Sequence, residues 1–240
     1  MYNNIVEGIF LKRPNRFIAH VLIGQKEEIA HVKNTSRCWE LLVPGARVLL
    51  EDNSMKENRK TKYSLIAVYK NDLLINIDSQ IPNEVVYNAI VDGKVCGLEH
   101  IFDLKREVKY KNSRFDMAFV KDGQRGFVEV KGVTLEQDGI VMFPGAPTTR
   151  GEKHVLEMID AVENGYLGYI IFLVQIENIK EFRLHWEMDE KFSRAMVLAK
   201  ESGVNIQAYD SIVFRNKLIL NHRLPLNFEN KEPIFFEKPQ

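Results

Sequence analysis

The stretch GFVEVKG at residues 126–132 decides the fold that we expect for this chain. The two-residue period of a β-strand places Glu129 and Lys131 on one face together with Phe127, and the two valines on the other. A strand this rich in Val and Phe is typical of the middle of a sheet. The pattern therefore predicts a central strand that carries a carboxylate and an ammonium group side by side.

A second carboxylate precedes this strand. Asp116 lies 13 residues before Glu129, within the strand-like run 114–120, and the Asp122-Gly123 turn connects the two strands. Two carboxylates and a lysine on neighbouring strands supply hard oxygen ligands for a divalent cation, with a positive charge beside them. The hydrolysis of a phosphodiester requires these groups.

The same residues predict a division of roles at a nuclease site. We expect Asp116 and Glu129 to hold Mg²⁺ or Mn²⁺, with the Val130 carbonyl as a further ligand. Lys131 is expected to orient or deprotonate the attacking water. The pattern alone also allows a solvated cross-strand face, with Asp116 at the start of a turn. The apolar strand that follows, residues 168–174, favours the catalytic interpretation, because a carboxylate in the middle of a sheet is costly to bury without a function.

Residues 1–82 predict a small all-β domain. Short strand-like runs alternate with turn residues in this part, without a convincing helix. We expect a partly open five-stranded barrel of the OB type, with an SH3-like barrel as the alternative, because closure removes exposed sheet edges. The strand-like runs are 5–11 with 17–23, 28–32, 47–51, 64–69 and 73–77.

Residues 83–240 predict an α/β domain in which helices flank a mixed sheet. One helix begins after Pro82, and a second begins at Thr148 or Thr149 and ends before Gly165. From about Ile212 we expect a tail. The expected helices are 83–91, 149–164 and 189–202, and the expected strands are 107–110, 114–120, 126–133, 168–174, 182–186 and 206–209.

Bulk composition limits the class of protein. Hydrophobic residues make up 45% of the chain and charged residues 28%, which is typical of a folded globular protein and argues against disorder or a disulfide scaffold. The two cysteines, Cys38 and Cys96, favour reduced thiols. The first residues lack the pattern of a signal peptide, and the apolar run 166–174 is too short to span a bilayer. We therefore expect a cytoplasmic protein without a membrane segment.

Two further groups of polar side chains are candidates for function. Arg150, His154 and Glu157 recur at helical spacing and form one polar stripe, and the turn-rich loop 143–149 is expected to shape the edge of the site. In the barrel, cations alternate with flat rings, a mixture that suits nucleic acids even in a chain of zero net charge. The cations are Arg13, Arg16, Lys33 and Arg37, and the rings include Trp39, whereas Phe17 is expected in the core.

Motifs spread over nearly the whole chain resemble one known family. They are NTSRC at 34–38, LVPG at 42–45, REVKY at 106–110, SRFD at 113–116, EVKGVTL at 129–135, FP at 143–144 and TRGEKH at 149–154. In this order they are similar to the sugar fermentation stimulation protein (SfsA) family. The resemblance implies an OB-like domain joined to a PD-(D/E)XK nuclease-like domain, DNA as the partner, and a role in regulating sugar metabolism, maltose in particular.

The resemblance also bears on individual residues. It implies that Glu107, Arg150 and His154 lie near the site, because they sit inside matched motifs. The missing carboxylate at position 88 removes an outer ligand and predicts weaker metal binding. The departures from the family pattern are Ser36 for an expected Gly, Gly145 for an expected Asp, and Asn88 for an expected Glu.

These observations support two functions on the same fold. The first is a Mg²⁺- or Mn²⁺-dependent nuclease that acts on DNA, and the second is a DNA-binding transcriptional regulator that keeps the nuclease scaffold without turnover. A third, less favoured function is an accessory protein for RNA or nucleotides, since OB barrels accept single strands. The sequence leaves open the nucleic-acid target and the oligomeric state, a homodimer included.

Overall fold

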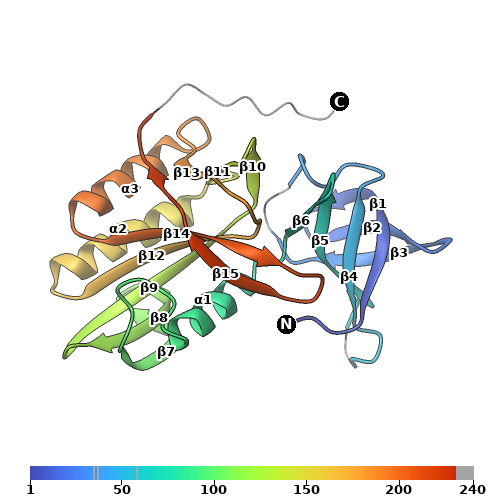
Figure 1. Ribbon diagram of the computed structural model, residues 1–240. Coiled ribbons are helices and arrows are strands. Elements are labelled where there is room, and N and C mark those ends of the chain that lie inside the picture. The colour runs from blue at the N-terminus through green and yellow to red at the C-terminus, as the bar shows by residue number, and fades with distance from the viewer. Residues whose placement is uncertain (35, 37, 58, 231–240) are drawn as a thin grey trace.

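The computed structural model describes residues 1–34, 36, 38–57 and 59–230 and contains a barrel and an α/β domain side by side (Figure 1). The barrel, in blue to cyan, comes first in the chain. In the second domain helices pack on a mixed sheet. Both parts of the predicted fold are confirmed. Arg37, one of the candidate cations, lies outside the described residues.

A pairing between the third and fifth strands closes the barrel. The strand order is β3-β2-β1-β4-β5-β6, and residues 30–32 of β3 also pair in parallel with residues 63–65 of β5. The first five strands thus form a closed barrel with few exposed edges, and β6 continues antiparallel from β5. The bounds are β1 Ile5–Asn15, β2 Ile18–Ile23, β3 Lys26–Val32, β4 Arg47–Asp52, β5 Tyr63–Lys70 and β6 Leu73–Asn76.

The hairpin between β1 and β2 differs from the prediction. The Asn15 side chain accepts hydrogen bonds from the N–H groups of Phe17 and Ile18, at 2.9 and 3.1 Å, and this fixes a tight turn. The turn leaves Phe17 53% exposed. The expectation of Phe17 in the core is wrong, because the ring belongs to the tip of the hairpin and not to a strand.

The second domain is built on a six-stranded mixed sheet of order β15-β14-β12-β9-β8-β7. β9, β12 and β14 run parallel to one another, and the other neighbours are antiparallel. The strands of this sheet are β7 Phe102–Tyr110, β8 Ser113–Lys121, β9 Gln124–Val133, β12 Leu167–Val174, β14 Asn205–Val213 and β15 Leu218–Arg223, and the helices are α1 Ile81–Val91, α2 Thr149–Glu163 and α3 Glu190–Glu201.

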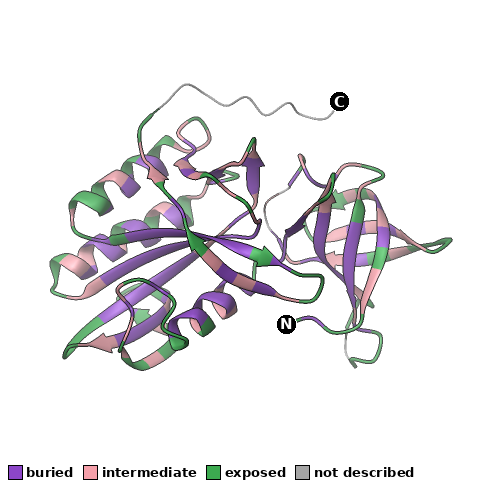
Figure 2. Cartoon of the chain, in the orientation of Figure 1, coloured by how far each residue is buried: buried purple, intermediate pink, exposed green. Residues whose placement is uncertain are grey.

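Helices cover both faces of this sheet. α1 packs into one cluster of buried side chains, which includes Val128 and Ile171, and α2 and α3 pack into the other, which includes Phe127 and Phe172. β9 and β12 are therefore buried from both sides, as predicted (Figure 2). In the part of the chain that the structure describes, no helix is long and apolar enough to cross a membrane.

The structure departs from the predicted elements in two places. A second, four-stranded sheet of order β10-β11-β13-β16 contains the predicted strand 182–186 as β13. Residues beyond Ile212 are not a tail, because β14 continues to Val213 and β15 returns antiparallel to it. Both features depend on pairing with distant segments, which a local pattern does not carry. The bounds are β10 Leu135–Gln137, β11 Ile140–Phe143, β13 Glu181–Leu184 and β16 Leu226–Asn227.

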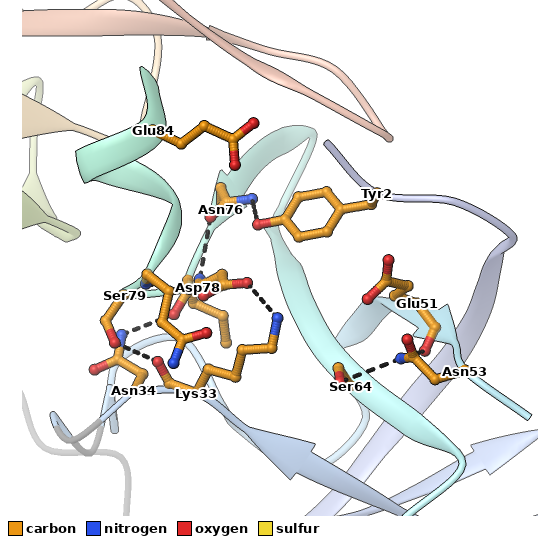
Figure 3. A network of polar contacts seen from close by, with 12 residues as sticks. Tyr2, Lys33, Asn34, Glu51, Asn53, Ser64, Asn76, Asp78, Ser79 and Glu84 are labelled. Atoms are coloured by element: carbon orange, nitrogen blue, oxygen red, sulfur yellow. Dashed lines mark hydrogen bonds and ion pairs between the residues drawn. The ribbon is translucent and has the colours of Figure 1, made fainter. Parts of the chain in front are cut away.

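Buried polar contacts join the two domains near the end of β6. The Gln175 amide, just after β12, donates to Asn76 Oδ1 at 2.8 Å and to the Asp78 carbonyl at 3.0 Å. Lys33 pairs with the Asp78 carboxylate at 2.9 Å, and Asn76 donates to the Tyr2 hydroxyl at 3.0 Å (Figure 3). Burial, and then the Asp78 charge, raise the pKa of Tyr2. These contacts fix the barrel against the carboxyl end of β12.

Candidate active site

Asp116 on β8 is hydrogen-bonded to the backbone of β9. The β8–β9 ladder ends at the pair Met117 and Val128. One residue further on, the Asp116 carboxylate acts as the acceptor, since its Oδ2 receives the Val130 N–H at 2.8 Å. Its Oδ1 accepts from the Asn83 side chain at 2.7 Å, in the first turn of α1. Both oxygens are therefore fixed in direction by donors from different elements.

Glu129 on β9 is held from two sides. Its Oε1 lies 2.5 Å from Lys131 Nζ and 2.5 Å from His154 Nδ1. Lys131 is on the same strand face, as the two-residue period predicts. His154 arrives on α2, which starts where Thr148 Oγ1 accepts the Gly151 N–H at 2.9 Å. We call Asp116, Glu129, Lys131 and His154 the carboxylate group of the sheet.

The two carboxylates have different acidities because their neighbours differ. Burial raises the pKa of Asp116 to about 6, with the Glu129 charge acting in the same direction against the Val130 N–H, Lys131 and Asn83. Burial also acts to raise the pKa of Glu129, but Lys131 and His154 outweigh it and hold that pKa below its usual value. Adjacent acids with pKa values pushed apart are typical of functional sites.

The carboxylate group suits a hard divalent cation. Glu129 Oε2 is buried and has no hydrogen-bond partner among the described residues, so its lone pairs are available to a ligand. Among the same residues, no cluster of three or more His, Cys, Asp or Glu side chains is arranged to hold a metal. Two carboxylates match Mg²⁺, because this ion commonly binds one or two carboxylates and keeps waters or substrate phosphates.

Other predicted site residues lie apart from this group. Glu107 is exposed on β7 and pairs with Arg114 at 3.1 Å. Arg150 is exposed in the first turn of α2. Val130 joins the group through its N–H, and the role of its carbonyl as a ligand stays a prediction. The motif match that implied a common neighbourhood therefore holds, in contact terms, for His154.

Asn83 belongs to the site although no motif indicated it. α1 begins at Ile81, two residues before the predicted start, and Asn83 lies in its first turn. Asn88, where the resemblance implies a glutamate, is exposed on the same helix. The proline at position 82 was the available signal, because a proline near the start of a helix fixes which side chains occupy the first turn.

The candidate cations of the barrel have different surroundings. The Arg13 guanidinium donates to the backbone carbonyls of Ser36, Arg16 and Asn34, at 2.9, 2.7 and 2.7 Å. Lys33 is ion-paired to Asp78, which is only 2% exposed. Arg16 is exposed, with its guanidinium 5.7 Å from the centre of the Phe17 ring. Arg13 and Lys33 thus hold the barrel structure, and Arg16 points a charge to the surface.

A cleft of about 1010 Å³ separates the barrel from the second domain. The barrel wall consists of the β1–β2 hairpin, residues 13–17, and residues of the segment 34–40. The opposite wall consists of residues 132–135 and 142–148. Gly132 follows Lys131 directly, and Thr148 caps the helix that carries His154. The cleft therefore borders the elements that hold the carboxylate group.

Two of the departures from the family pattern meet in this cleft. A Cβ atom added at Gly145 would lie 3.5 Å from Ser36 Oγ, which is ordinary van der Waals contact. Ser36 belongs to the barrel wall and Gly145 to the opposite wall. The two departures therefore affect one place, where the walls of the cleft approach each other.

Comparisons with known proteins cover both domains. Residues 11–77 match a family model described as SfsA N-terminal OB domain, and residues 80–217 match one described as Sugar fermentation stimulation protein RE domain. The chain is 54% identical over 231 residues to a sugar fermentation stimulation protein homolog of Alkaliphilus oremlandii, with 95% of this chain and 98% of that protein covered. A homolog of the same description from Clostridium botulinum is 49% identical over 227 residues, with 94% and 97% covered.

A solved structure shares the whole two-domain arrangement. The chain is similar to Pyrococcus furiosus SfsA in complex with Ca²⁺, with a TM-score of 0.86 and 27% sequence identity. The match covers 95% of this chain and 98% of that one. The likeness therefore extends across the barrel, the sheet and the cleft between them.

Proposed function

Since the chain belongs to the sugar fermentation stimulation protein family, we propose that it is a Mg²⁺- or Mn²⁺-dependent nuclease that acts on DNA. Both cysteines, Cys38 and Cys96, are free, which supports action in the cytoplasm. DNA is the substrate class that an OB barrel beside a phosphodiester-cleaving site favours.

One observation carries the proposal. Glu129, 3% exposed, keeps one carboxylate oxygen without a partner while the raised pKa of Asp116 reflects the second carboxylate beside it. Two buried acids that repel each other cost stability, and a divalent cation between them removes that cost. Asp116, Glu129 and the Val130 carbonyl would hold the cation.

The cation, when bound, stabilises negative charge on the attacked phosphate. The protein supplies the remaining functions. Lys131 Nζ uses one donor on Glu129 Oε1 and retains others for a water or a phosphate oxygen. His154 holds the same Glu129 oxygen in place, and Asn83 does so for Asp116. These side chains orient the ligands and the nucleophile before the substrate arrives.

The Ca²⁺ bound to the Pyrococcus furiosus relative supports a cation in this protein as well. Calcium and magnesium are both hard cations that take oxygen ligands. The carboxylate oxygens of the present chain are of that kind, so an alkaline-earth ion is the chemistry we assign to it.

A second function is favoured by a separate observation. The described residues supply two clustered carboxylates and no third, and Asn88 is exposed and neutral. A scaffold with weak cation affinity could bind DNA and regulate the genes of sugar metabolism, maltose included, without cutting it. This role is the alternative to the nuclease.

Cleavage assays separate the two functions. The purified protein is incubated with single- and double-stranded DNA and RNA in Mg²⁺, Mn²⁺ or EDTA, together with Asp116→Asn and Lys131→Ala. The nuclease requires cutting that depends on the metal and is lost in both variants. DNA binding without cutting under every metal condition would establish the regulator instead.

A further inference from the structure

We propose that the cleft between the barrel and the second domain is a subsite for single-stranded DNA, with bases stacked on Phe17 and Trp39. The inference rests on the proposed function, because it names the form of the substrate that reaches the carboxylate group. It is carried by the rings, charge, size and position of the cleft.

The two rings are exposed where a base could reach them. Phe17 is 53% exposed and Trp39 is 52% exposed, and both line the cleft. Exposed large rings lose contact area to water, whereas stacking on a nucleobase buries a ring face without any requirement for base identity. Rings on one wall of a groove are typical of sites for single strands.

The charge at the same wall fits a phosphate backbone. Arg16 adjoins Phe17 at the hairpin tip, where its guanidinium is exposed. Arg13 is bonded to three carbonyls and acts by holding the hairpin to residues 34 and 36. One surface cation beside exposed rings suits a strand whose phosphates run past the hairpin.

The floor of the cleft is built from residues that are already fixed. Asn34 donates to the Ile77 carbonyl at 2.9 Å, and the Ser79 hydroxyl donates to the Lys33 carbonyl (Figure 3). Gln175 bonds to Asn76 and Asp78 from the sheet side. A pre-formed floor reduces the ordering that a bound strand requires.

The size of the cleft selects the form of the nucleic acid. Its volume of about 1010 Å³ is at the upper end of the range for sites that enclose a small molecule. It has room for a few nucleotides of one strand, whereas a duplex would have to rest on the rim. Stacking also requires unpaired bases, since a paired base hides its faces within the helix.

The position of the cleft leads a strand toward the carboxylate group. The cleft lies beyond the carboxyl ends of the parallel strands β9 and β12, where Gly132, Val133 and Gln175 line it. Ligands of open α/β sheets bind at this end of the strands. The same β9 carries Glu129 and Lys131, so a strand held in the cleft is close to them along the sheet.

Binding is tested on the full chain carrying Asp116→Asn, in EDTA, so that no cleavage enters the measurement. The probe is a labelled dT oligomer of about 12 nucleotides, within the range of OB site sizes, compared with a duplex of the same length. Fluorescence anisotropy gives the affinity. Trp39 emission, in a Trp186→Phe background, reports stacking directly, and anisotropy alone suffices if that background does not fold.

The single strand is expected to bind at least about tenfold more tightly than the duplex and to quench Trp39. Phe17→Ala should weaken its binding about tenfold, and Trp39→Ala should do the same. Phe102→Ala is the matched control, because Phe102 is 69% exposed on β7 and is not among the described residues that line the cleft. Its affinity should not change.

Equal or tighter binding of the duplex, or unchanged affinity in the Phe17→Ala and Trp39→Ala variants, would overturn the subsite. These outcomes are independent of catalysis. If the strand binds as expected but wild type never cuts it, the nuclease fails and the subsite stands. If wild type cuts duplex DNA and the ring variants cut it equally well, the subsite fails and the nuclease stands.

Discussion

His154 Nδ1 lies 2.5 Å from Glu129 Oε1, so that a helix and the central strand of the sheet meet at a carboxylate. His154 is 8% exposed and Glu129 is 3% exposed. A hydrogen bond between such buried groups fixes the direction of the carboxylate, and it leaves Oε2 as the oxygen that faces a ligand. The docking of α2 is in this way part of the site.

The role of His154 is tested by His154→Ala. Removing the ring leaves Glu129 with Lys131 alone, and loss of such an outer partner typically lowers metal affinity about 10- to 100-fold. The loss of the buried hydrogen bond should also cost about 1–3 kcal/mol of unfolding free energy. Calorimetric Mn²⁺ titration and chemical denaturation measure the two effects. Arg150→Ala, on the exposed side of α2, is the control, and equal Mn²⁺ affinity in all three proteins would contradict the assignment.

Asn83 is expected to tune Asp116. Its amide donates to Asp116 Oδ1 at 2.7 Å and acts to lower the pKa of that carboxyl. Asn83→Ala should therefore raise the pKa of Asp116 further, which NMR titration of the carboxyl carbon can follow. Asn88→Ala removes the same side chain from an exposed position of the same helix and should leave the pKa unchanged. A shift of equal size in both variants would argue against a specific contact.

Stability should depend on pH through Asp116 when no metal is present. Burial, and then Glu129, raise its pKa from 3.8 to about 6, so its stabilising contribution is complete below pH 3.8 and is lost as the pH rises through about 6. Asp116→Asn keeps the group neutral. In EDTA it should exceed wild type by on the order of 2 kcal/mol at pH 8 and by little at pH 4. Denaturation at both pH values measures this, and a gain that is independent of pH would contradict the cause.

Lys33 is expected to contribute to stability more than to nucleic-acid affinity. It pairs with Asp78, which is 2% exposed, so Lys33→Met leaves a buried carboxylate without its cation. Such a loss typically costs about 3–5 kcal/mol. Lys26→Met is the control, because Lys26 is exposed and pairs with Glu28 at the surface. Urea denaturation compares the two, and equal losses would show that the pair between the domains has no special weight.

The parts of the site that the sequence predicts are those that depend on local geometry. Glu129 and Lys131 share a face because side chains on a strand alternate, and Asp116 is near because a short turn connects its strand to theirs. The strands 126–133 and 168–174 were predicted for the same reason, since their apolar runs require burial on both sides.

The remaining parts depend on packing between distant segments. Asn83 meets Asp116 across 33 residues, and His154 meets Glu129 across 25, so neither contact leaves a periodic signal. Phe17 was misplaced because its exposure follows from an Asn15 turn at a hairpin tip and not from the hydrophobicity of its strand. Arg13 and Lys33 match a nucleic-acid pattern by type, yet their buried partners are visible only in the folded chain.

The most direct test of the central claim is the rate at which the protein cuts a labelled DNA oligomer in Mg²⁺, measured for wild type and for Glu129→Gln. The amide has the shape of the carboxylate without its charge, so the account predicts cutting by wild type that EDTA abolishes. It also predicts a loss of at least about 100-fold in the variant, with Arg150→Ala unaffected. If wild type binds the oligomer but does not cut it in Mg²⁺ or Mn²⁺, or if Glu129→Gln cuts as fast as wild type, the claim of a nuclease at this carboxylate group is contradicted.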